Sequence, residues 1–564
     1  MRLINAATLR LEDYLDDVPP YAILSHTWGD EEVSFQDISH PTSVPTAKAG
    51  YSKIVESSRL ARQLGHKHIW IDTCCIDKTS SAELTESINS MFRWYKEAQV
   101  CLAYLSDLES SAAVTEDSLG NCRWFTRGWT LQELLAPRAL YFYDRSWTYR
   151  GTKEEYTAEL SAITGIQPGA LQGTRHLSDY SVATRMSWAA HRKTTRLEDT
   201  AYALLGIFDT NLPLIYGEGS NAFRRLQEEI VKRSNDMTIF AWEANADPAG
   251  PPTGKYSDLF APSPAAFLES KGIQYFERAE FDPEFAITNK GLQMEGQLTL
   301  LLRDDPFLGV ARYSLRLGAR WTDDDHCFEI GIPLCKVGPS VFVREANGQP
   351  LTSLGVMERE AAPLTTLHRF FVCADRNQAG VLEQRAWDGA VRFYRGPAAP
   401  AAMVAIPETH WDRTKDLFFV PRQRNLVFAA TLAVTLSSFQ AELVVLIDHR
   451  TSIPTLRIFS AAKYPRLQRW LFRHRHAAGS MTWSDIDLDL GELPELSDKI
   501  TILVSDKAFY VTALLVQGVV ESNSGEADAY YVKVEVDEGS RYSLGSVKRL
   551  FSVTGSSDSK PVLN

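Results

Sequence analysis

Glu133 and Trp129 are the two side chains whose types and spacing point most directly to chemistry. They stand four residues apart in a stretch, residues 127–137, whose leucines at positions 131, 134 and 135 follow a helical period. We expect the leucines to pack in the core and the Trp129–Glu133 face to form the wall of a pocket. The alternative is an ordinary amphipathic helix, with a solvated glutamate and a tryptophan that covers a neighbouring loop.

Further polar clusters follow short apolar runs that are typical of buried strands. Residues 21–25 end in Ser25 and continue into a polar turn with His26, Trp28 and Gly29; residues 68–71 lead to Asp72; and residues 100–105 lead to Ser106 and Asp107.

Helical patterns separate these predicted strands and indicate how they pair. They cover residues 51–64 and 83–98, and a fourth strand is predicted at 139–143, after the Glu133 helix. Strands that alternate with helices predict a parallel sheet covered on both faces. Because such sheets bind ligands at the carboxyl ends of their strands, we expect these polar clusters to share a cleft with Glu133.

Several of these residues also have ordinary structural interpretations. His26 either lines the cleft or ties its loop to a neighbouring strand. Asp72 either contacts a ligand or, as is more common, accepts a structural hydrogen bond. Adjacent Cys74 and Cys75 have no histidine at a catalytic spacing and are expected to pack in the core. The spacing of nearby histidines and cysteines matches no zinc pattern, so we predict no metal site.

Length and composition favour a soluble protein of several domains. The chain has 564 residues and a net charge of −12, which provides no general attraction to nucleic acid or to anionic membranes. Its seven cysteines are expected to be reduced thiols. No signal peptide is visible at the N-terminus, and the most membrane-like run, residues 426–434, is too short to cross a bilayer. The cytoplasm is therefore the expected location.

Changes of pattern along the chain predict its domain limits. We expect an α/β domain at residues 1–165, a helical continuation at 166–243, a mostly antiparallel β region at 253–555 and a disordered tail at 556–564. The linker is predicted within residues 244–252. A Gly217-x-Gly219 pair before a helix is interpreted as a structural turn rather than an anion site, because no P-loop lysine follows it.

Three blocks of the sequence together resemble a known family. Residues 21–29 (YAILSHTWG), 70–77 (WIDTCCID) and 127–136 (RGWTLQELLA) closely resemble the motifs of the fungal heterokaryon-incompatibility (HET) domain. The segments around residues 192–199 and 213–219 look like the helical continuation of such proteins. The resemblance implies a fold similar to the Toll/interleukin-1 receptor (TIR) domain, which is a flavodoxin-like parallel sheet.

The same resemblance implies an activity. Some TIR domains cleave NAD with a glutamate in a Trp-x-x-x-Glu pattern, and here this pattern falls on Trp129 and Glu133. Glu133 would then be catalytic, with NAD as the substrate rather than a cofactor. The substrate-binding residues would be those of the predicted cleft: Trp129, Ser25, His26, Trp28, Gly29 and Asp72.

Two classes of function remain open. The first is an NAD-cleaving enzyme (an NAD nucleosidase) of fungal self/non-self recognition that causes cell death. The second is a TIR-like signalling scaffold that assembles without catalysis. Self-association on activation is expected in either class, with no nucleic acid or membrane partner.

Overall fold

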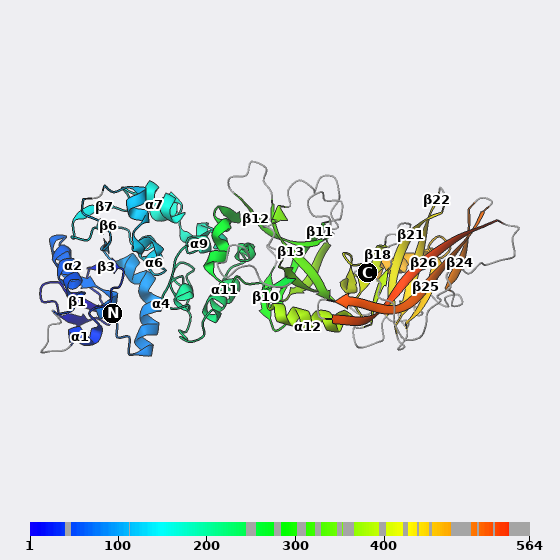
Figure 1. Ribbon diagram of the computed structural model, residues 1–564, viewed down its shortest axis with the longest axis horizontal. Coiled ribbons are helices and arrows are strands. Elements are labelled where there is room, and N and C mark those ends of the chain that lie inside the picture. Colours follow the sequence, from blue (N-terminus) through cyan, green and yellow to red (C-terminus); the bar gives the residue numbers. More distant parts are fainter. Residues whose placement is uncertain are drawn as a thin grey trace.

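The computed structural model places the parts of the chain along one long axis (Figure 1). The N-terminal α/β unit lies at one end, the helical segment follows it, and the β-rich region occupies the other half. The structure describes residues 1–39, 47–111, 113–243, 255–275, 284–301, 312–321, 329–346, 352–353, 366–387, 389–393, 402–420, 427–436, 439–449, 454–474, 498–504, 507–522 and 525–540. The predicted linker and the predicted tail lie outside the described residues.

The N-terminal sheet contains seven strands among the described residues, in the order β2-β1-β4-β3-β5-β6-β7. Strand β3 pairs parallel with β4 and β5, and β5 pairs parallel with β6, whereas β1, β2 and β7 extend the edges antiparallel. Numbered along the chain, the parallel strands have the order 2-1-3-4, which begins the doubly wound flavodoxin-like order. The predicted α/β sheet is confirmed. Its strands are β1 (Arg2–Asn5), β2 (Leu11–Asp13), β3 (Tyr21–His26), β4 (His68–Trp70), β5 (Val100–Tyr104), β6 (Leu140–Tyr143) and β7 (Tyr149–Thr152).

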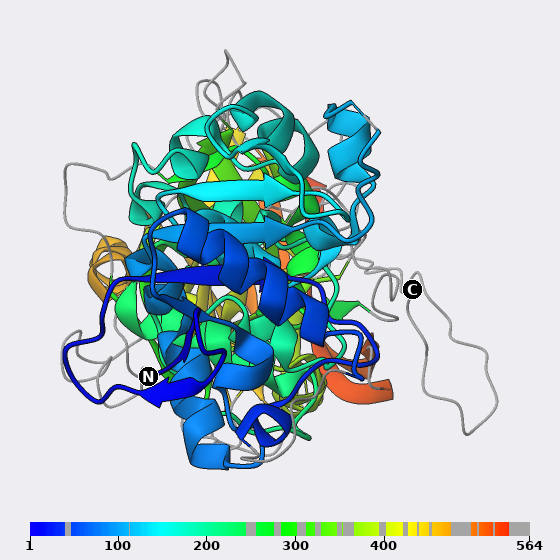
Figure 2. The ribbon, with the colours of Figure 1, turned by 90° about the vertical axis from the view of Figure 1, so that its left-hand side faces the viewer.

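Helices cover both faces of this sheet, as parallel strands require. Helix α2 lies across one face, seen in front of the sheet in Figure 2, and α4 and α6 lie on the other face, towards the helical segment (Figure 1). The strand residues predicted to be buried are buried in the structure, among them Ile23, Leu24, Leu102 and Phe142. The helices are α1 (Phe35–Ser39), α2 (Tyr51–Gln63), α3 (Asp72–Cys75), α4 (Ser81–Glu97), α5 (Glu116–Gly120), η1 (Arg123–Thr126), α6 (Thr130–Leu135), α7 (Thr157–Thr164) and α8 (Pro168–Leu171).

The helical segment packs directly on α4. The Asn89 side chain exchanges two hydrogen bonds of 3.0 Å with the backbone of Leu212. A Cβ on Gly206 would lie 2.0 Å from Phe92 Cβ, so only glycine permits this approach. The predicted helical continuation consists of short helices joined by turns and one longer helix, α11: η2 (Leu177–Asp179), α9 (Val182–Ser187), α10 (Asp199–Tyr202), α11 (Asn221–Arg233) and η3 (Met237–Phe240).

The first part of the β-rich region is a sheet of nine described strands. The pairings are antiparallel except that β14 pairs parallel with β16. Its elements are β8 (Tyr256–Ser257), η5 (Pro264–Ser270), β9 (Ile273–Tyr275), β10 (Phe285–Thr288), β11 (Gly291–Leu301), β12 (Arg312–Trp321), β13 (Glu329–Gly338), β14 (Val341–Glu345), β15 (Thr352–Ser353) and β16 (Thr366–Val372).

The distal part packs a six-stranded sheet on a four-stranded one, counted over the described residues, around a shared apolar core. Strands β17 and β26 pair parallel and the other pairs are antiparallel, so the predicted β-rich character is confirmed. The elements are α12 (Arg376–Trp387), β17 (Ala390–Phe393), β18 (Ala402–Ile406), η7 (Glu408–His410), β19 (Trp411–Asp412), β20 (Leu417–Phe418), β21 (Val427–Leu436), β22 (Phe439–Asp448), β23 (Thr455–Ser460), α13 (Pro465–His474), β24 (Lys499–Val504), β25 (Lys507–Ser522) and β26 (Gly525–Ser540).

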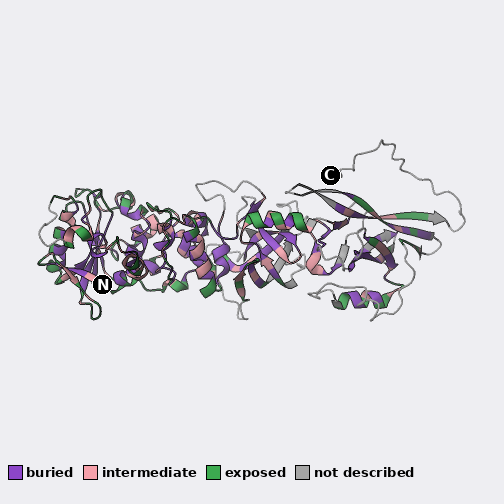
Figure 3. Ribbon diagram, turned by 90° about the horizontal axis from the view of Figure 1, so that it is seen from below, coloured by how far each residue is buried: buried purple, intermediate pink, exposed green. Residues whose placement is uncertain are grey.

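One continuous core links the N-terminal unit to the first β sheet. The cluster of buried apolar residues runs from Leu3 to Val372, whereas the distal sandwich has clusters of its own. Figure 3 shows buried residues running through the parts of the molecule. Buried Arg344 on β14 reinforces the junction, because its guanidinium donates to Phe240 O at 2.8 Å and lies 3.7 Å from the Trp242 ring centroid. The helical segment is therefore fixed at both ends.

Candidate functional site

The centre of the candidate site is Ser25 at the carboxyl end of β3. Strand β3 is buried along its whole length and lies between two parallel neighbours. Ser25 Oγ donates a hydrogen bond to Glu133 Oε2 and accepts one from Trp124 Nε1 at 2.7 Å. A buried serine thus joins the central strand to the helix that carries the carboxyl group.

Glu133 is buried rather than solvated. Every residue of α6 is buried, and Glu133 has 6% relative exposure. The alternative of an ordinary amphipathic helix with a solvated glutamate is therefore wrong. The leucine side of α6 faces the core of the sheet. The helical segment covers the opposite side, which an isolated amphipathic helix would expose to solvent.

Burial controls the ionisation of Glu133. Burial, and to a lesser extent the negative charge of Asp72, raise the pKa of this carboxyl group to about 8 against the opposite effects of Ser25, Tyr95 and Arg192. The Tyr95 hydroxyl also donates to Leu24 O at 3.2 Å. With no ligand bound, Glu133 is therefore largely protonated at neutral pH.

His26 is the next buried polar group after Ser25. Its Nε2 lies 3.7 Å from Glu32 Oε2 and its Nδ1 lies 3.9 Å from Asp72 Oδ1, both too long for a hydrogen bond. In the part of the chain that the structure describes, neither ring nitrogen has a hydrogen-bond partner. His26 therefore makes no hydrogen bond to a neighbouring strand in the described structure, and its buried ring faces the carboxylates of Glu32 and Asp72.

Glu32 organises the loop that follows β3. Burial alone would raise its pKa, but His26 and Lys53 lower it to about 2. Its Oε1 accepts from Lys53 Nζ and, at 2.8 Å, from the backbone N–H of Gly29. The Gly29 amide, predicted to bind substrate, is thus used by Glu32 in this structure.

Trp28 and Asp72 lie together at the rim of the site. Trp28 is 44% exposed and donates from Nε1 to Asp72 Oδ2 at 2.8 Å. The Lys78 ammonium lies 3.5 Å from the Trp28 ring centroid, a cation–π contact. Asp72 has the structural hydrogen bond expected of it, and it also lies close enough to affect Glu133 electrostatically.

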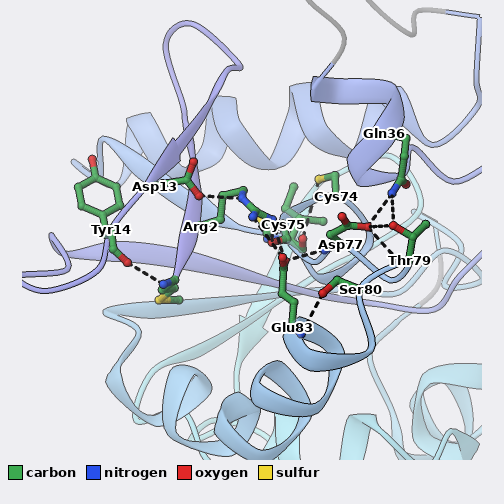
Figure 4. Close-up of polar contacts among 12 residues, drawn as sticks. Arg2, Asp13, Tyr14, Gln36, Cys74, Cys75, Asp77, Thr79, Ser80 and Glu83 are labelled. Atoms are coloured by element: carbon green, nitrogen blue, oxygen red, sulfur yellow. Dashed lines mark hydrogen bonds and ion pairs between the residues drawn. The ribbon is translucent and has the colours of Figure 1, made fainter. Parts of the chain in front are cut away.

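The turn after α3 is anchored from the N-terminus of the chain, as Figure 4 shows. Arg2 Nη1 donates to Glu83 Oε1 at 2.7 Å and to Cys75 O at 3.3 Å. The same Glu83 oxygen accepts from the Asp77 backbone N–H at 2.7 Å. These contacts hold the start of α4 against the end of α3 and so fix the position of Asp72, the first residue of α3.

Trp129 stands one helical turn before Glu133, but it does not contact Ser25 through a hydrogen bond in the described structure. It precedes α6 and hydrogen-bonds to Asp199 of the helical segment; burial raises the pKa of Asp199, and Tyr216 and Trp129 lower it. The tryptophan that contacts Ser25 is instead Trp124, which our sequence interpretation missed. The geometry thus brings together Glu133, Ser25, His26 and Asp72, with Trp28 at the rim.

Other sequence predictions concern the surroundings of the site. The amides of Gly217 and Gly219 both donate to Glu198 Oε1, at 2.7 and 3.0 Å, so this turn has an internal partner. Cys74 and Cys75 are buried free thiols, as expected. Over the described residues, no group of histidine, cysteine and acidic side chains is arranged to hold a metal ion.

The arrangement can stabilise positive charge on a bound ligand. The carboxyl end of the central strand is where doubly wound sheets bind ligands. A buried carboxyl group there, supported by Ser25 and with Asp72 nearby, provides negative potential once it ionises. Exposed Trp28 offers an aromatic surface beside Asp72.

Comparison with known proteins places this doubly wound unit in a class. Residues 21–118 match the family model described as Heterokaryon incompatibility protein (HET). Residues 221–290 match a domain of unknown function (DUF8212). The N-terminal part of the chain is therefore related to heterokaryon-incompatibility proteins.

A particular relative is the Vegetative incompatibility protein HET-E-1 of Podospora anserina. It is 48% identical over 224 residues, which cover 38% of this chain and 16% of that relative. This chain therefore corresponds to about a sixth of the relative's length. No solved structure matches the chain. No helix within the described ranges is both long and apolar enough to cross a membrane.

Proposed function

We propose that this protein acts in fungal heterokaryon incompatibility and causes cell death by hydrolysing the bond between nicotinamide and ribose in NAD. The N-terminal HET match and the 48% identity to an incompatibility protein support the biological role. The parallel strand order supports a TIR-like fold for this unit. The proposal also includes self-association on activation and a cytoplasmic location, without a nucleic acid or membrane partner.

The contact between Ser25 and Glu133 carries the proposal. It places a buried carboxyl group beneath the loop that follows the central parallel strand. Burial keeps this group mostly neutral before substrate binds, with a pKa of about 8. NAD carries a positive charge on its nicotinamide ring, and a nearby cation favours the ionised carboxylate. Substrate binding thus ionises the group that the reaction needs.

The main catalytic requirement of the reaction is the negative charge of the ionised Glu133 carboxylate. As the bond breaks, positive charge develops on the ribose carbon while nicotinamide leaves as a neutral ring, so no general acid is required. A preorganised carboxylate stabilises such an oxocarbenium-like transition state, as in glycoside hydrolysis. Glu133 fills this role and Ser25 holds its side chain in place.

The remaining predicted residues bind or orient substrate in this proposal. His26 offers two unpartnered ring nitrogens to the ribose or a phosphate. Asp72 and Trp28 form the rim of the site. The backbone of Gly29 binds the ribose or a phosphate of NAD, in exchange for its hydrogen bond to Glu32. Trp129 borders the substrate one helical turn before Glu133, and its contact with Asp199 holds it against the helical segment.

A non-catalytic scaffold is the second candidate. It is favoured by the Ser25 contact, because the Glu133 carboxyl group already has an internal hydrogen-bond partner. In this case the cluster stabilises the fold, and the surface of the α/β unit performs the function by assembling with other copies.

Release of nicotinamide separates the two candidates. Purified full-length protein is incubated with NAD, and free nicotinamide is measured for the wild type, Glu133→Gln and the control Glu86→Gln, an exposed glutamate on α4. The enzyme proposal predicts about 10²–10³-fold slower release for Glu133→Gln and wild-type release for the control. On expression in a fungus, the wild type and Glu86→Gln should cause cell death, whereas Glu133→Gln should not. A folded Glu133→Gln protein that still kills cells would support the scaffold.

A further inference from the structure

Arg192 reaches the Glu133 helix from the helical segment, outside the N-terminal sheet. Its Nη1 donates to Arg127 O at 2.8 Å and to Thr130 Oγ1 at 2.9 Å. Thr130 and Glu133 are three residues apart on α6 and therefore neighbours along one side of the helix. The guanidinium thus lies about one helical turn from the carboxyl group.

Backbone contacts fix Arg192 in this position. The Gly128 N–H donates to Lys193 O at 2.9 Å, and the Lys193 N–H donates to Thr126 O at 2.7 Å, which gives a parallel bridge between the two segments. A Cβ on Gly128 would lie 2.4 Å from Thr194 Cγ2, so the close approach depends on glycine. The sequence therefore builds a docking site for the strand-like piece that carries Arg192.

Arg192 is half-buried, and its guanidinium is incompletely paired. Its Nη2 atom has no hydrogen-bond partner in the described part of the chain. Burial lowers the pKa of Arg192 to about 9 and Glu133 raises it, so the side chain remains a cation at neutral pH. A buried cation with a free donor is costly, and its nearby carboxyl group is the natural group to balance the charge.

The other groups that affect Glu133 come from each element packed around it. Ser25 on β3 and Tyr95 on α4 offer hydroxyl groups, whereas Asp72 on α3 adds a negative charge. The Cys101 thiol on β5 also interacts with Glu133, and burial raises the pKa of that thiol. Arg192 is the cation of this set and opposes both burial and Asp72.

We propose that Arg192 is a positioning residue that makes ionisation of the Glu133 carboxyl group possible. The helical segment delivers it, so the site is complete only when residues 192–194 are docked beside residues 126–128. Its importance for NAD cleavage rests on the function proposed above, but its effect on Glu133 is independent of that function.

Titration of Glu133 in the full-length protein tests this proposal directly. Protein labelled with ¹³C at the glutamate carboxyl carbon is titrated by NMR, and the signal lost in Glu133→Gln identifies the residue. In Arg192→Met the titration midpoint should rise by about one pH unit, a tenfold loss of ionised carboxylate near neutral pH. Arg196→Met removes the same charge at an exposed position of the same segment and should leave the midpoint unchanged. An unchanged midpoint in folded Arg192→Met would overturn the proposal.

A second variant covers the case in which Arg192→Met does not fold. Thr130→Val removes the hydroxyl group that holds Nη1 but keeps Arg192 and the shape of the side chain. Its midpoint should move upwards by a smaller amount, and no movement would refute the role of Arg192. The pH profile of nicotinamide release is measured in parallel. If the wild type does not cleave NAD, the proposed function fails, whereas the NMR titration still decides the role of Arg192.

Discussion

The two ends of the molecule bury carboxyl groups in opposite ways. In the distal β region, Asp412 is fully buried, but it pairs with Lys415 Nζ at 3.0 Å and accepts from Thr414 Oγ1 at 2.6 Å. Burial alone would raise the pKa of Asp412, yet Lys415 and Thr414 lower it. In the N-terminal site, the Glu133 carboxyl group accepts from the neutral hydroxyl of Ser25, and burial raises its pKa to about 8.

The carboxylate of Asp412 is a structural charge, whereas the carboxyl group of Glu133 is available for chemistry. Asp412 balances its charge with the Lys415 ammonium at 3.0 Å, although its Oδ2 has no hydrogen-bond partner among the described residues. The N-terminal site leaves His26 nitrogens and one Arg192 nitrogen without hydrogen bonds in the described structure. Incomplete pairing of buried polar groups is costly at both sites, so the difference between them lies in the countercharge, which is an ammonium at Asp412 and a neutral hydroxyl at Glu133.

Removing the cation from the distal pair should have the largest effect on stability. Lys415→Met leaves Asp412 buried without its partner, which should cost about 3–5 kcal/mol of unfolding free energy. The matched control is Lys533→Met, because Lys533 pairs with Glu535 on the surface and should contribute under about 1 kcal/mol. Chemical denaturation compares the two variants. Equal losses would show that the Asp412 cluster is not a structural ion pair.

The pH dependence of stability should have opposite signs at the two carboxyl groups. The folded-state pKa of Glu133 is about 8, above its ordinary value of 4.5. Its contribution to the free energy of unfolding is therefore fully present below pH 4.5 and is lost as pH rises through 8. Asp412 has a lowered pKa, so its contribution is present above pH 3.8 and is lost as pH falls.

Unfolding measured from pH 5 to 9 tests the Glu133 part of this prediction. Wild type should lose about 3–4 kcal/mol more stability than Glu133→Gln across this range, because glutamine does not titrate. Parallel curves for the two proteins would mean that Glu133 ionises normally in the folded state.

Gly128→Ala should disturb the docking that brings Arg192 to α6. The added Cβ clashes with Thr194 and should cost about 1–3 kcal/mol. Gly380→Ala on α12 is a suitable control, since its Cβ would meet no atom within 4 Å. Thermal unfolding should show a lower midpoint for the first variant and an unchanged or slightly higher midpoint for the second, because alanine favours the helix more than glycine does. Equal midpoints would argue against tight docking.

Trp28→Phe should have the smallest effect. It removes the indole donor to Asp72 at a half-exposed rim and should cost under about 1 kcal/mol. A substantially larger loss, measured by the same thermal unfolding, would give Trp28 a structural role instead of a place at the entrance of the site.

The sequence predicted the sheet well because its signals are local. The apolar run ending in Ser25 and the helical patterns that follow it are visible within short windows, and their alternation implies parallel pairing. The position of Asp72 at a strand end follows from the same pattern. Most of the polar cluster can therefore be placed from local patterns alone.

The sequence could not reveal the environment of Glu133, because that environment comes from distant residues. A helical pattern separates an apolar face from a polar one, but it cannot show that a segment some sixty residues later covers the polar face. Arg192 belongs to a recognisable motif, yet nothing in its spacing connects it to Thr130. Trp124 was missed because Trp129 matched the expected pattern. The domain limits and the substrate remain predictions.

The pH dependence of nicotinamide release tests the central claim, that a buried Glu133 carboxyl group must ionise to cleave NAD. The ratio kcat/KM reports the free enzyme, so it should rise with pH and level off above about 8 in the wild type. Glu133→Gln should be at least about 10²-fold slower, with no such rise. Wild-type protein that releases no nicotinamide at any pH, or a folded Glu133→Gln variant that releases it at the wild-type rate, would contradict the claim.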